Sequence, residues 1–143
     1  MKPSCILVDI DGTLALKGKR DPYDFSKVLE DSLNLIVHDV ISAYLSLNPD
    51  IEPIFVSGRS DICIEDTREW LFDKCLFLRD SDFHLFMRKN EDYRNDFTVK
   101  EEIYLEKIAP HYSVRLIFDD RDSVVKMWRS HGLTCFQVAD GNF

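Results

Sequence analysis

The sequence lacks the segments that would carry a chain into or across a membrane. It contains no apolar run long enough to span a bilayer. Its first residues hold one lysine and then enter an apolar, strand-like run, so we expect no signal peptide. None of its four cysteines forms a C-x-x-C pair, which argues against a structural zinc site. These absences predict a reduced, cytoplasmic protein with no membrane association.

Linkers, internal repeats and low-complexity segments are also missing. With 143 residues, of which 45% are hydrophobic and 31% charged, the chain is predicted to form one domain over residues 1–143 with a sizeable core. The formal net charge of −8 argues against non-specific binding to polyanions. It leaves open a nucleic-acid substrate that is contacted at one local basic site.

One stretch near the start of the chain, Ile6-Leu7-Val8-Asp9-Ile10-Asp11-Gly12-Thr13, organises the rest. An apolar run that ends in acidic residues and glycine is typical of a buried strand with polar groups at its C-terminal edge. Because strand residues alternate between faces, Asp9 and Asp11 are expected to project to the same side. Two carboxylates so close repel each other unless a cation or a shared proton relieves them. The pair therefore favours a divalent metal site, acid/base chemistry, or both.

Two other structures could produce this stretch. Asp and Gly are common turn residues, so a simple turn stays open. A calcium loop needs a bidentate Glu at its last ligand position, and the two registers that fit the stretch place Arg20 or Gly18 there. The calcium loop is therefore discounted.

The rest of the chain alternates between strand-like and helical patterns. Short apolar runs predict strands at about residues 53–56, 85–87, 114–118 and 134–138. Apolar residues at helical spacing, with capping and stop signals, predict helices at about residues 31–47, 61–74, 98–109 and 123–131. Residues 14–28 are polar and predict a flap-like loop. The alternation favours an α/β fold with a Rossmann-like parallel sheet and helices on both faces.

Polar residues follow several of these strands. In parallel sheets the site lies beyond the carboxyl ends of the strands, so these residues are expected to meet at one edge. They are Asp9, Asp11, Ser57, Arg59, Arg88, Asp119 and Asp120, with Lys100 near the start of a helix. Each of them alone has an ordinary explanation as a cap, a loop residue or a solvated charge. Together, four acids and several cations at one edge suit phosphoryl transfer assisted by Mg²⁺.

In such chemistry, Asp9 and one of Asp119 or Asp120 can ligate the metal. A carboxylate can also attack phosphorus and form an aspartyl-phosphate. Asp11 can then protonate the leaving oxygen and later deprotonate the hydrolytic water. Ser57, Lys100 and nearby backbone amides can hold the remaining phosphoryl oxygens, where negative charge must be stabilised.

These residues also resemble a known family. The order Asp9-Ile10-Asp11-Gly12-Thr13, Ser57-Gly58-Arg59, Lys100 and Asp119-Asp120 resembles the four motifs of the haloacid dehalogenase (HAD) superfamily of phosphohydrolases. Further segments resemble the 3′-phosphatase domain of phage-type polynucleotide kinase/phosphatase. They are Arg20-Asp21-Pro22-Tyr23-Asp24, Val99-Lys100-Glu101-Glu102-Ile103, Ile108-Ala109-Pro110-His111 and Met127-Trp128-Arg129.

The resemblance implies a HAD-type fold with a minimal cap. It also implies Mg²⁺-dependent removal of 3′-phosphates from DNA or RNA ends, and opening of 2′,3′-cyclic phosphate ends. By position in the motifs, Asp9 is the expected nucleophile and Asp11 the expected general acid/base. The groups expected to hold the metal are Asp9, the backbone carbonyl of Asp11, and Asp120, with Asp119 supporting them. Those expected to bind the phosphate or the nucleic-acid end are Thr13, Arg20, Ser57, Gly58, Arg59, Arg88 and Lys100.

The phage-type enzymes carry a kinase domain with a G-x-x-x-x-G-K-[ST] loop, and this sequence has none. We therefore expect no 5′-kinase activity from these residues, and a separate kinase or ligase partner fits that expectation. Tyr23, in the flap-like loop, is the aromatic residue expected to stack on a base, whereas Trp70 and Trp128 fit inward helix positions.

Two other functions stay open. A small-molecule phosphatase of the same superfamily, acting on nucleotides or sugar phosphates, also suits a compact acidic chain. A phospho-acceptor switch or an inactive interaction module would use a similar acidic cluster. Asp11 supplies a base that can hydrolyse an aspartyl-phosphate, which favours turnover over storage.

Overall fold

A five-stranded parallel sheet forms the centre of the computed structural model, which describes residues 1–143. The strands are β1 (Ser4–Val8), β4 (Glu52–Ser60), β5 (His84–Arg88), β6 (Ser113–Asp119) and β7 (Cys135–Gln137). Their spatial order is β5-β4-β1-β6-β7, and every pairing is parallel. The central strand β1 is covered on both faces, which explains its uninterrupted apolar sequence.

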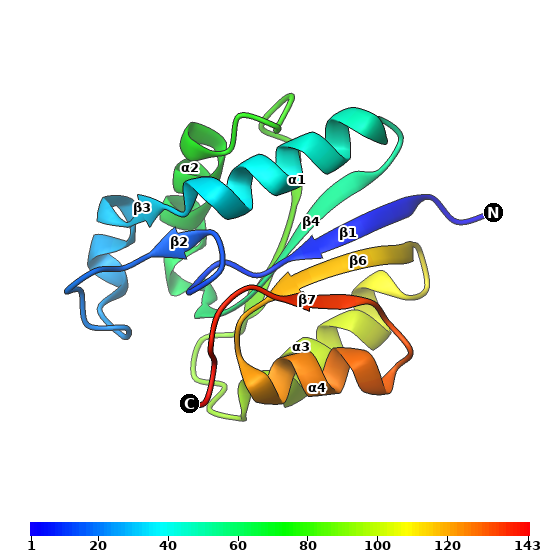
Figure 1. Cartoon of the computed structure of the whole chain (residues 1–143). Coiled ribbons are helices and arrows are strands. Elements are labelled where there is room, and N and C mark those ends of the chain that lie inside the picture. Colours follow the sequence, from blue (N-terminus) through cyan, green and yellow to red (C-terminus); the bar gives the residue numbers. More distant parts are fainter.

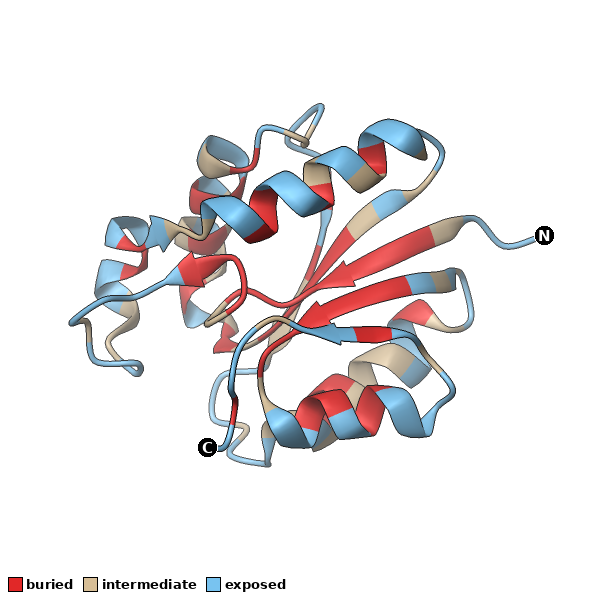
Figure 2. Cartoon of the chain, in the orientation of Figure 1, coloured by how far each residue is buried: buried red, intermediate tan, exposed pale blue.

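Four helices cover the two faces of this sheet (Figure 1). They are α1 (Leu35–Leu47) and α2 (Ile64–Lys74) on one face, and α3 (Asp96–Ile103) and α4 (Asp122–Ser130) on the other. Side chains alternate along β1, so that Ile6 and Val8 pack in the core under α1 and α2, whereas Cys5 and Leu7 pack in the core with α4. The central strands are buried and the outer helix surfaces exposed (Figure 2). The predicted α/β architecture is confirmed.

A small lobe lies beyond the carboxyl end of β1, between β1 and α1 (Figure 1). It consists of a two-stranded antiparallel sheet, β2 (Ala15–Leu16) and β3 (Ser32–Leu33), and a 3₁₀ helix, Phe25–Glu30. The predicted flap-like loop is therefore partly regular, and the helix predicted from residue 31 begins four residues later. The reason is local pairing, because the Asn34 N–H donates to the Leu14 carbonyl (2.7 Å) before the helix starts.

Two further helix predictions need correction at their ends. The helix predicted for residues 98–109 begins at Asp96, is α-helical to Ile103 and continues as a π-helical segment, Tyr104–Ile108. The second predicted helix begins with a 3₁₀ turn, Asp61–Cys63, in which the Ser60 hydroxyl oxygen accepts a hydrogen bond from the Ile62 N–H (3.3 Å). Both tryptophans are buried, as predicted. None of the helices combines the length and apolar content that a membrane crossing requires.

Candidate active site

The carboxyl ends of β1, β4 and β6 meet at one edge of the sheet, next to the small lobe (Figure 1). Asp9 directly follows β1, and its N–H donates to the Phe118 carbonyl (3.0 Å), which extends the ladder with β6 by one residue. The chain then turns at Gly12, whose φ of +77° favours glycine. A Cβ atom on Gly12 would overlap the Asp120 carboxylate. Glycine therefore lets the β1 loop pass directly against Asp120.

Asp9 is buried and held by two hydrogen-bond donors. Lys100 Nζ donates to Asp9 Oδ1 (2.7 Å), and Thr13 Oγ1 donates to Asp9 Oδ2 (2.7 Å). Lys100 also donates to Asp119 Oδ2 (3.0 Å), so that one buried ammonium ties α3 to the ends of β1 and β6. These charge-assisted contacts fix the orientation of the Asp9 carboxylate.

Asp9, Asp119 and Asp120 form an acidic cluster, in which one oxygen of each carboxylate lies within 4.8 Å of the others. When all three carboxylates are ionised, the Lys100 ammonium balances only one of them and two negative charges remain in a buried site. Burial, reinforced by the charge of Asp119, raises the pKa of Asp9 well above its ordinary value. Burial likewise raises the pKa of Asp120. A divalent cation would balance this charge, and carboxylate oxygens are ligands that Mg²⁺ prefers, so the residues fit such an ion.

Asp11 lies outside the acidic cluster and begins a charge chain, formed by Asp11, Arg59, Asp31 and Arg20. Arg59 donates through Nε and Nη2 to the two Asp11 oxygens (2.9 and 2.8 Å). Arg59 Nη2 also donates to Asp31 Oδ2 (2.9 Å), and Asp31 accepts two more bonds from Arg20 (2.9 and 3.0 Å). The Arg59 and Asp31 side chains are each 1% exposed, whereas that of Asp11 is 46% exposed. The guanidinium fork thus holds Asp11 from the buried side and leaves it accessible.

The turn after β4 is shaped by small residues. Ser57 is buried, and its Oγ accepts a hydrogen bond from the Arg59 N–H (3.0 Å), which sets the direction of the Arg59 side chain. Gly58 packs against Asp96, since a Cβ atom on Gly58 would lie 2.7 Å from Asp96 Oδ1. Neither Ser57 nor Gly58 can therefore be enlarged without displacing the groups behind it.

Asp96 is a site residue that the motifs did not indicate. One of its oxygens accepts a hydrogen bond from Arg88 and the other accepts one from Arg121 (2.5 Å). It joins the end of β5 to the start of α4 beside Gly58. The signal available in the sequence is its spacing, because Asp96 precedes Lys100 by four residues and both project from one face of α3.

One cavity of about 500 Å³ opens over these groups, and we call it the catalytic cavity. The expected site residues that line it are Asp9, Asp11, Gly58, Arg59, Lys100, Asp119 and Asp120. Thr13 and Ser57 are fully buried and do not line the cavity, but they bond to Asp9 and Arg59, which do. Arg20 and Arg88 do not line it, because their N–H groups bond to Asp31 and to the Asp96 region. Contact of these two arginines with substrate stays a prediction.

Residues 3–143 match the family model described as the polynucleotide kinase PNKP phosphatase domain. The chain belongs to this family. The fold is therefore that of a HAD-type phosphatase domain.

Three similar proteins illustrate where this phosphatase domain is found, and each of the matching chains is longer than this one. A proposed bifunctional polynucleotide kinase/RNA ligase of Autographa californica nuclear polyhedrosis virus is 38% identical over 130 residues, which cover 89% of this chain and 18% of the viral protein. A chain in the structure of the Pnkp1/Rnl/Hen1 RNA repair complex gives a TM-score of 0.87 and 38% identity, covering 99% of this chain and 44% of that chain. The class C acid phosphatase of Bacillus anthracis shares the fold alone, with a TM-score of 0.60 and 16% identity, over 87% of this chain and 54% of that one. The chain spans less than two thirds of each.

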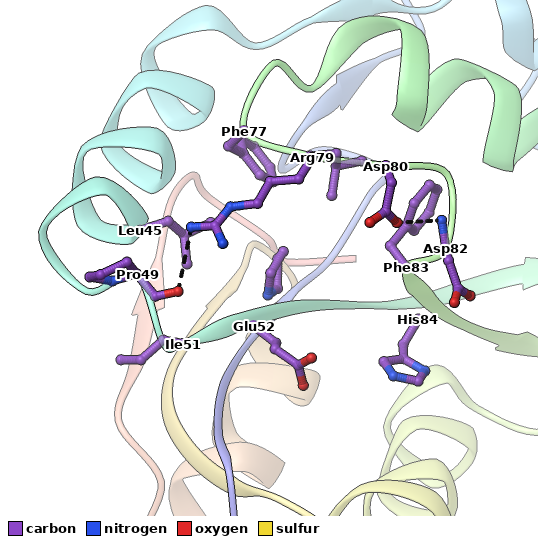
Figure 3. Close-up of a pocket in the computed structure, with 12 residues that line it drawn as sticks. Leu45, Pro49, Ile51, Glu52, Phe77, Arg79, Asp80, Asp82, Phe83 and His84 are labelled. Atoms are coloured by element: carbon purple, nitrogen blue, oxygen red, sulfur yellow. Dashed lines mark hydrogen bonds between the residues drawn. The ribbon is translucent and has the colours of Figure 1, made fainter.

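A smaller cavity of about 280 Å³ lies at the opposite end of β4, near the end of α1 (Figure 3). Two of its polar side chains bond to backbone groups of the same cavity wall. Arg79 Nη2 donates to the Pro49 carbonyl (3.5 Å), and Asp80 Oδ1 accepts a hydrogen bond from the Asp82 N–H (2.8 Å). None of the expected phosphatase residues lines this cavity. This smaller cavity is therefore separate from the catalytic cavity, which lies over the acidic cluster.

Proposed function

We propose that this phosphatase domain is a Mg²⁺-dependent polynucleotide 3′-phosphatase that acts through an aspartyl-phosphate on Asp9. The observation that carries the proposal is a pair of aspartates held in different ways at one cavity. Asp9 is buried and fixed by Lys100 and Thr13, which suits a nucleophile. Asp11 is partly exposed and fixed by Arg59, which suits a group that exchanges protons with substrate and water. Membership in a polynucleotide kinase phosphatase-domain family supports a nucleic-acid end as the substrate.

The proposed reaction has two steps. First, a carboxylate oxygen of Asp9 attacks phosphorus, the bond between phosphorus and O3′ breaks, and Asp11 gives its proton to O3′. This leaves an aspartyl-phosphate and a strand with a free 3′-hydroxyl. Second, a water molecule attacks the same phosphorus while Asp11 accepts its proton, and the bond between phosphorus and the Asp9 oxygen breaks. Inorganic phosphate leaves, and both aspartates return to their starting states.

The charged groups around Asp9 have separate proposed roles. Asp9, Asp119, Asp120 and the backbone carbonyl of Asp11 would hold Mg²⁺, which supplies positive charge beside the transferring phosphoryl group. Lys100 neutralises part of the acidic cluster and keeps Asp9 oriented during attack. The residues proposed to bind the phosphoryl oxygens are Gly58, Arg59 and Lys100, which line the catalytic cavity. Thr13 and Ser57 are proposed to support them through their bonds to Asp9 and Arg59.

The test compares oligonucleotides that carry a 3′-phosphate, a 5′-phosphate or a 2′,3′-cyclic phosphate, each with Mg²⁺ and with EDTA. We expect phosphate release from the 3′-phosphorylated strand in Mg²⁺ only. Asp9→Asn should abolish turnover and leave the circular dichroism spectrum unchanged, because Asn has the same shape and is a poor nucleophile. A preference for the 5′-phosphate or for free nucleotides would reject the end assignment, and a phosphoenzyme that persists for many minutes would indicate a phospho-acceptor instead.

We further propose that the domain works beside a ligase and a kinase in nucleic-acid end repair. Joining of two strands requires a free 3′-hydroxyl, which is the product of this reaction. The viral relative is a proposed kinase/ligase, and the structural relative belongs to an RNA repair complex, which supports this context. All four cysteines are buried and unpaired, which supports a reducing, cytoplasmic setting.

A further inference from the structure

A second cavity, of about 600 Å³, adjoins the catalytic cavity. The two share six lining residues, among them Tyr23, Gly58 and Asp96. The remaining lining comes mainly from the loop between β5 and α3. The proposed chemistry leaves this second cavity unexplained, because neither Asp9 nor Asp11 lines it.

The second cavity is rich in aromatic side chains, and we call it the aromatic cavity. Five of its sixteen lining residues are aromatic, against 12% of the chain. They are Tyr23, Phe25, Tyr93, Phe97 and Phe143. The residues Tyr23 and Tyr93 are 83% and 90% exposed, so their rings are not part of the hydrophobic core. Exposed aromatic rings around a concave surface provide faces on which nucleobases can stack.

The charges that line the aromatic cavity largely cancel. Three arginines (Arg88, Arg94 and Arg121) are matched by three acids (Glu91, Asp92 and Asp96). Arg94 donates to the Asp92 carboxylate (2.7 Å), while Arg88 and Arg121 both donate to the Asp96 carboxylate. Cations that are already paired attract a phosphate backbone only weakly. The lining therefore favours recognition of bases over recognition of backbone phosphates.

Arg88 holds the loop that carries Tyr93 against Gly58, a residue of the catalytic cavity. Arg88 donates to the backbone carbonyls of Asp92 (2.9 Å) and Arg94 (2.5 Å), which flank Tyr93. The same guanidinium donates to the Gly58 carbonyl (2.8 Å), and Gly58 lines both cavities. The Tyr93 backbone is thus fixed relative to the catalytic cavity before any ligand arrives, which reduces the entropy lost on binding.

We infer that the aromatic cavity binds the last nucleosides of a single-stranded, 3′-phosphorylated oligonucleotide by stacking on Tyr23 and Tyr93. This inference rests on the proposed 3′-phosphatase function. A phosphate in the catalytic cavity is joined through O3′ to the last nucleoside, which must lie in the adjoining space. The aromatic cavity is continuous with the catalytic cavity and presents stacking faces there.

The experiment measures kcat/KM for a 3′-phosphorylated trinucleotide and for p-nitrophenyl phosphate, and takes the ratio of the two. In Tyr93→Ala and in Tyr23→Ala we expect this ratio to fall about 10-fold, because one stacking face is lost. Tyr93→Phe should keep the wild-type ratio, since the ring and not the hydroxyl makes the contact. Phe72→Ala is the matched control, because Phe72 is an exposed aromatic residue on α2 that lines neither cavity.

The outcomes separate this inference from the function on which it rests. An unchanged ratio in both alanine variants overturns the aromatic cavity as a nucleoside site and leaves the 3′-phosphatase proposal intact. A wild-type protein that hydrolyses p-nitrophenyl phosphate but not the trinucleotide overturns the proposed function itself. The dependence on salt gives a second readout. Stacking predicts a slope of log(kcat/KM) against log[salt] that is no steeper than about −1. Contact with three phosphates would give a slope of about −2, and that result would overturn binding by stacking.

Discussion

Asp31 lies between two arginines at the centre of the charge chain and is the residue on which that chain depends most. Its side chain is 1% exposed and accepts three hydrogen bonds, two from Arg20 and one from Arg59. Its backbone carbonyl accepts a separate bond from Trp70 Nε1 (2.8 Å), which a side-chain substitution leaves in place. The substitution Asp31→Asn keeps the shape of the side chain and removes its charge.

The expected loss of folding stability in Asp31→Asn follows from the hydrogen bonds that an asparagine can and cannot make at this position. One side-chain oxygen can still accept a bond from Arg20, but the amide N–H₂ would face N–H donors of Arg20 or Arg59. Breaking a buried ion pair by removing one partner costs about 3–5 kcal/mol, and the retained acceptor favours the lower end, about 3 kcal/mol. For a chain of this size that corresponds to a fall in Tm of roughly 6–12 °C. Arg59 would also hold Asp11 less firmly, so kcat at low temperature should fall by about 10-fold or more.

Urea unfolding and thermal unfolding, both followed by circular dichroism near neutral pH, measure the loss of stability. Asp39→Asn is the control, because its carboxylate is 67% exposed and pairs only with its neighbour His38. We expect the control to change stability by less than about 0.5 kcal/mol. A loss below about 1 kcal/mol in Asp31→Asn would refute the reasoning, since the two arginines would then be held without their shared carboxylate.

Three other perturbations test other parts of the structure. Burial raises the folded-state pKa of Asp120, so this carboxyl lowers stability as the pH rises from its unfolded-state pKa through its folded-state pKa. Asp120→Asn should therefore raise the urea midpoint of the metal-free protein near pH 7 but not near pH 3, where the carboxyl is protonated in both states. Added Mg²⁺ should raise the Tm of the wild type and much less that of this variant, by calorimetry. Gly141→Ala should cost about 1–3 kcal/mol in thermal unfolding, because its Cβ would overlap the backbone of Asp120. Since burial raises the pKa of Cys5, Cys75 and Cys135 to about 12, iodoacetamide near pH 8 should label native protein negligibly and denatured protein at all four cysteines, by mass spectrometry.

The sheet and the ends of its strands could be predicted because each has a local signal. The apolar run before Asp9 and the one before Asp119 are long enough to identify buried strands, and parallel pairing then brings their ends together. The same logic predicted the helices, because their apolar spacing and stop residues are local. Strands of two residues, such as Ala15–Leu16 and Ser32–Leu33, are too short to carry a periodic pattern, which is why the small lobe was expected to be a loop.

The charge chain could not be predicted from the sequence. Asp31 lies 11 residues from Arg20 and 28 residues from Arg59, and no helical or strand spacing relates them. Their meeting depends on how the small lobe folds back over the end of β4. Asp96 was also missed, because the helix was predicted to begin at about residue 98 and the two arginines that bind Asp96 come from other elements.

The alternation of side chains along β1 determines both which residues pack in each core and where Asp9 points. The odd-numbered side chains Cys5 and Leu7 point toward the helix layer that contains α4, and Asp9 continues that series, so Lys100 of α3 can reach it. Inserting a single residue inside β1 would turn every later side chain of the strand to the opposite face of the sheet. The Asp9 carboxylate would then point away from Lys100, and the apolar side chains of β1 would face the other helix layer. The number of residues in β1 therefore determines whether Asp9 can meet Lys100.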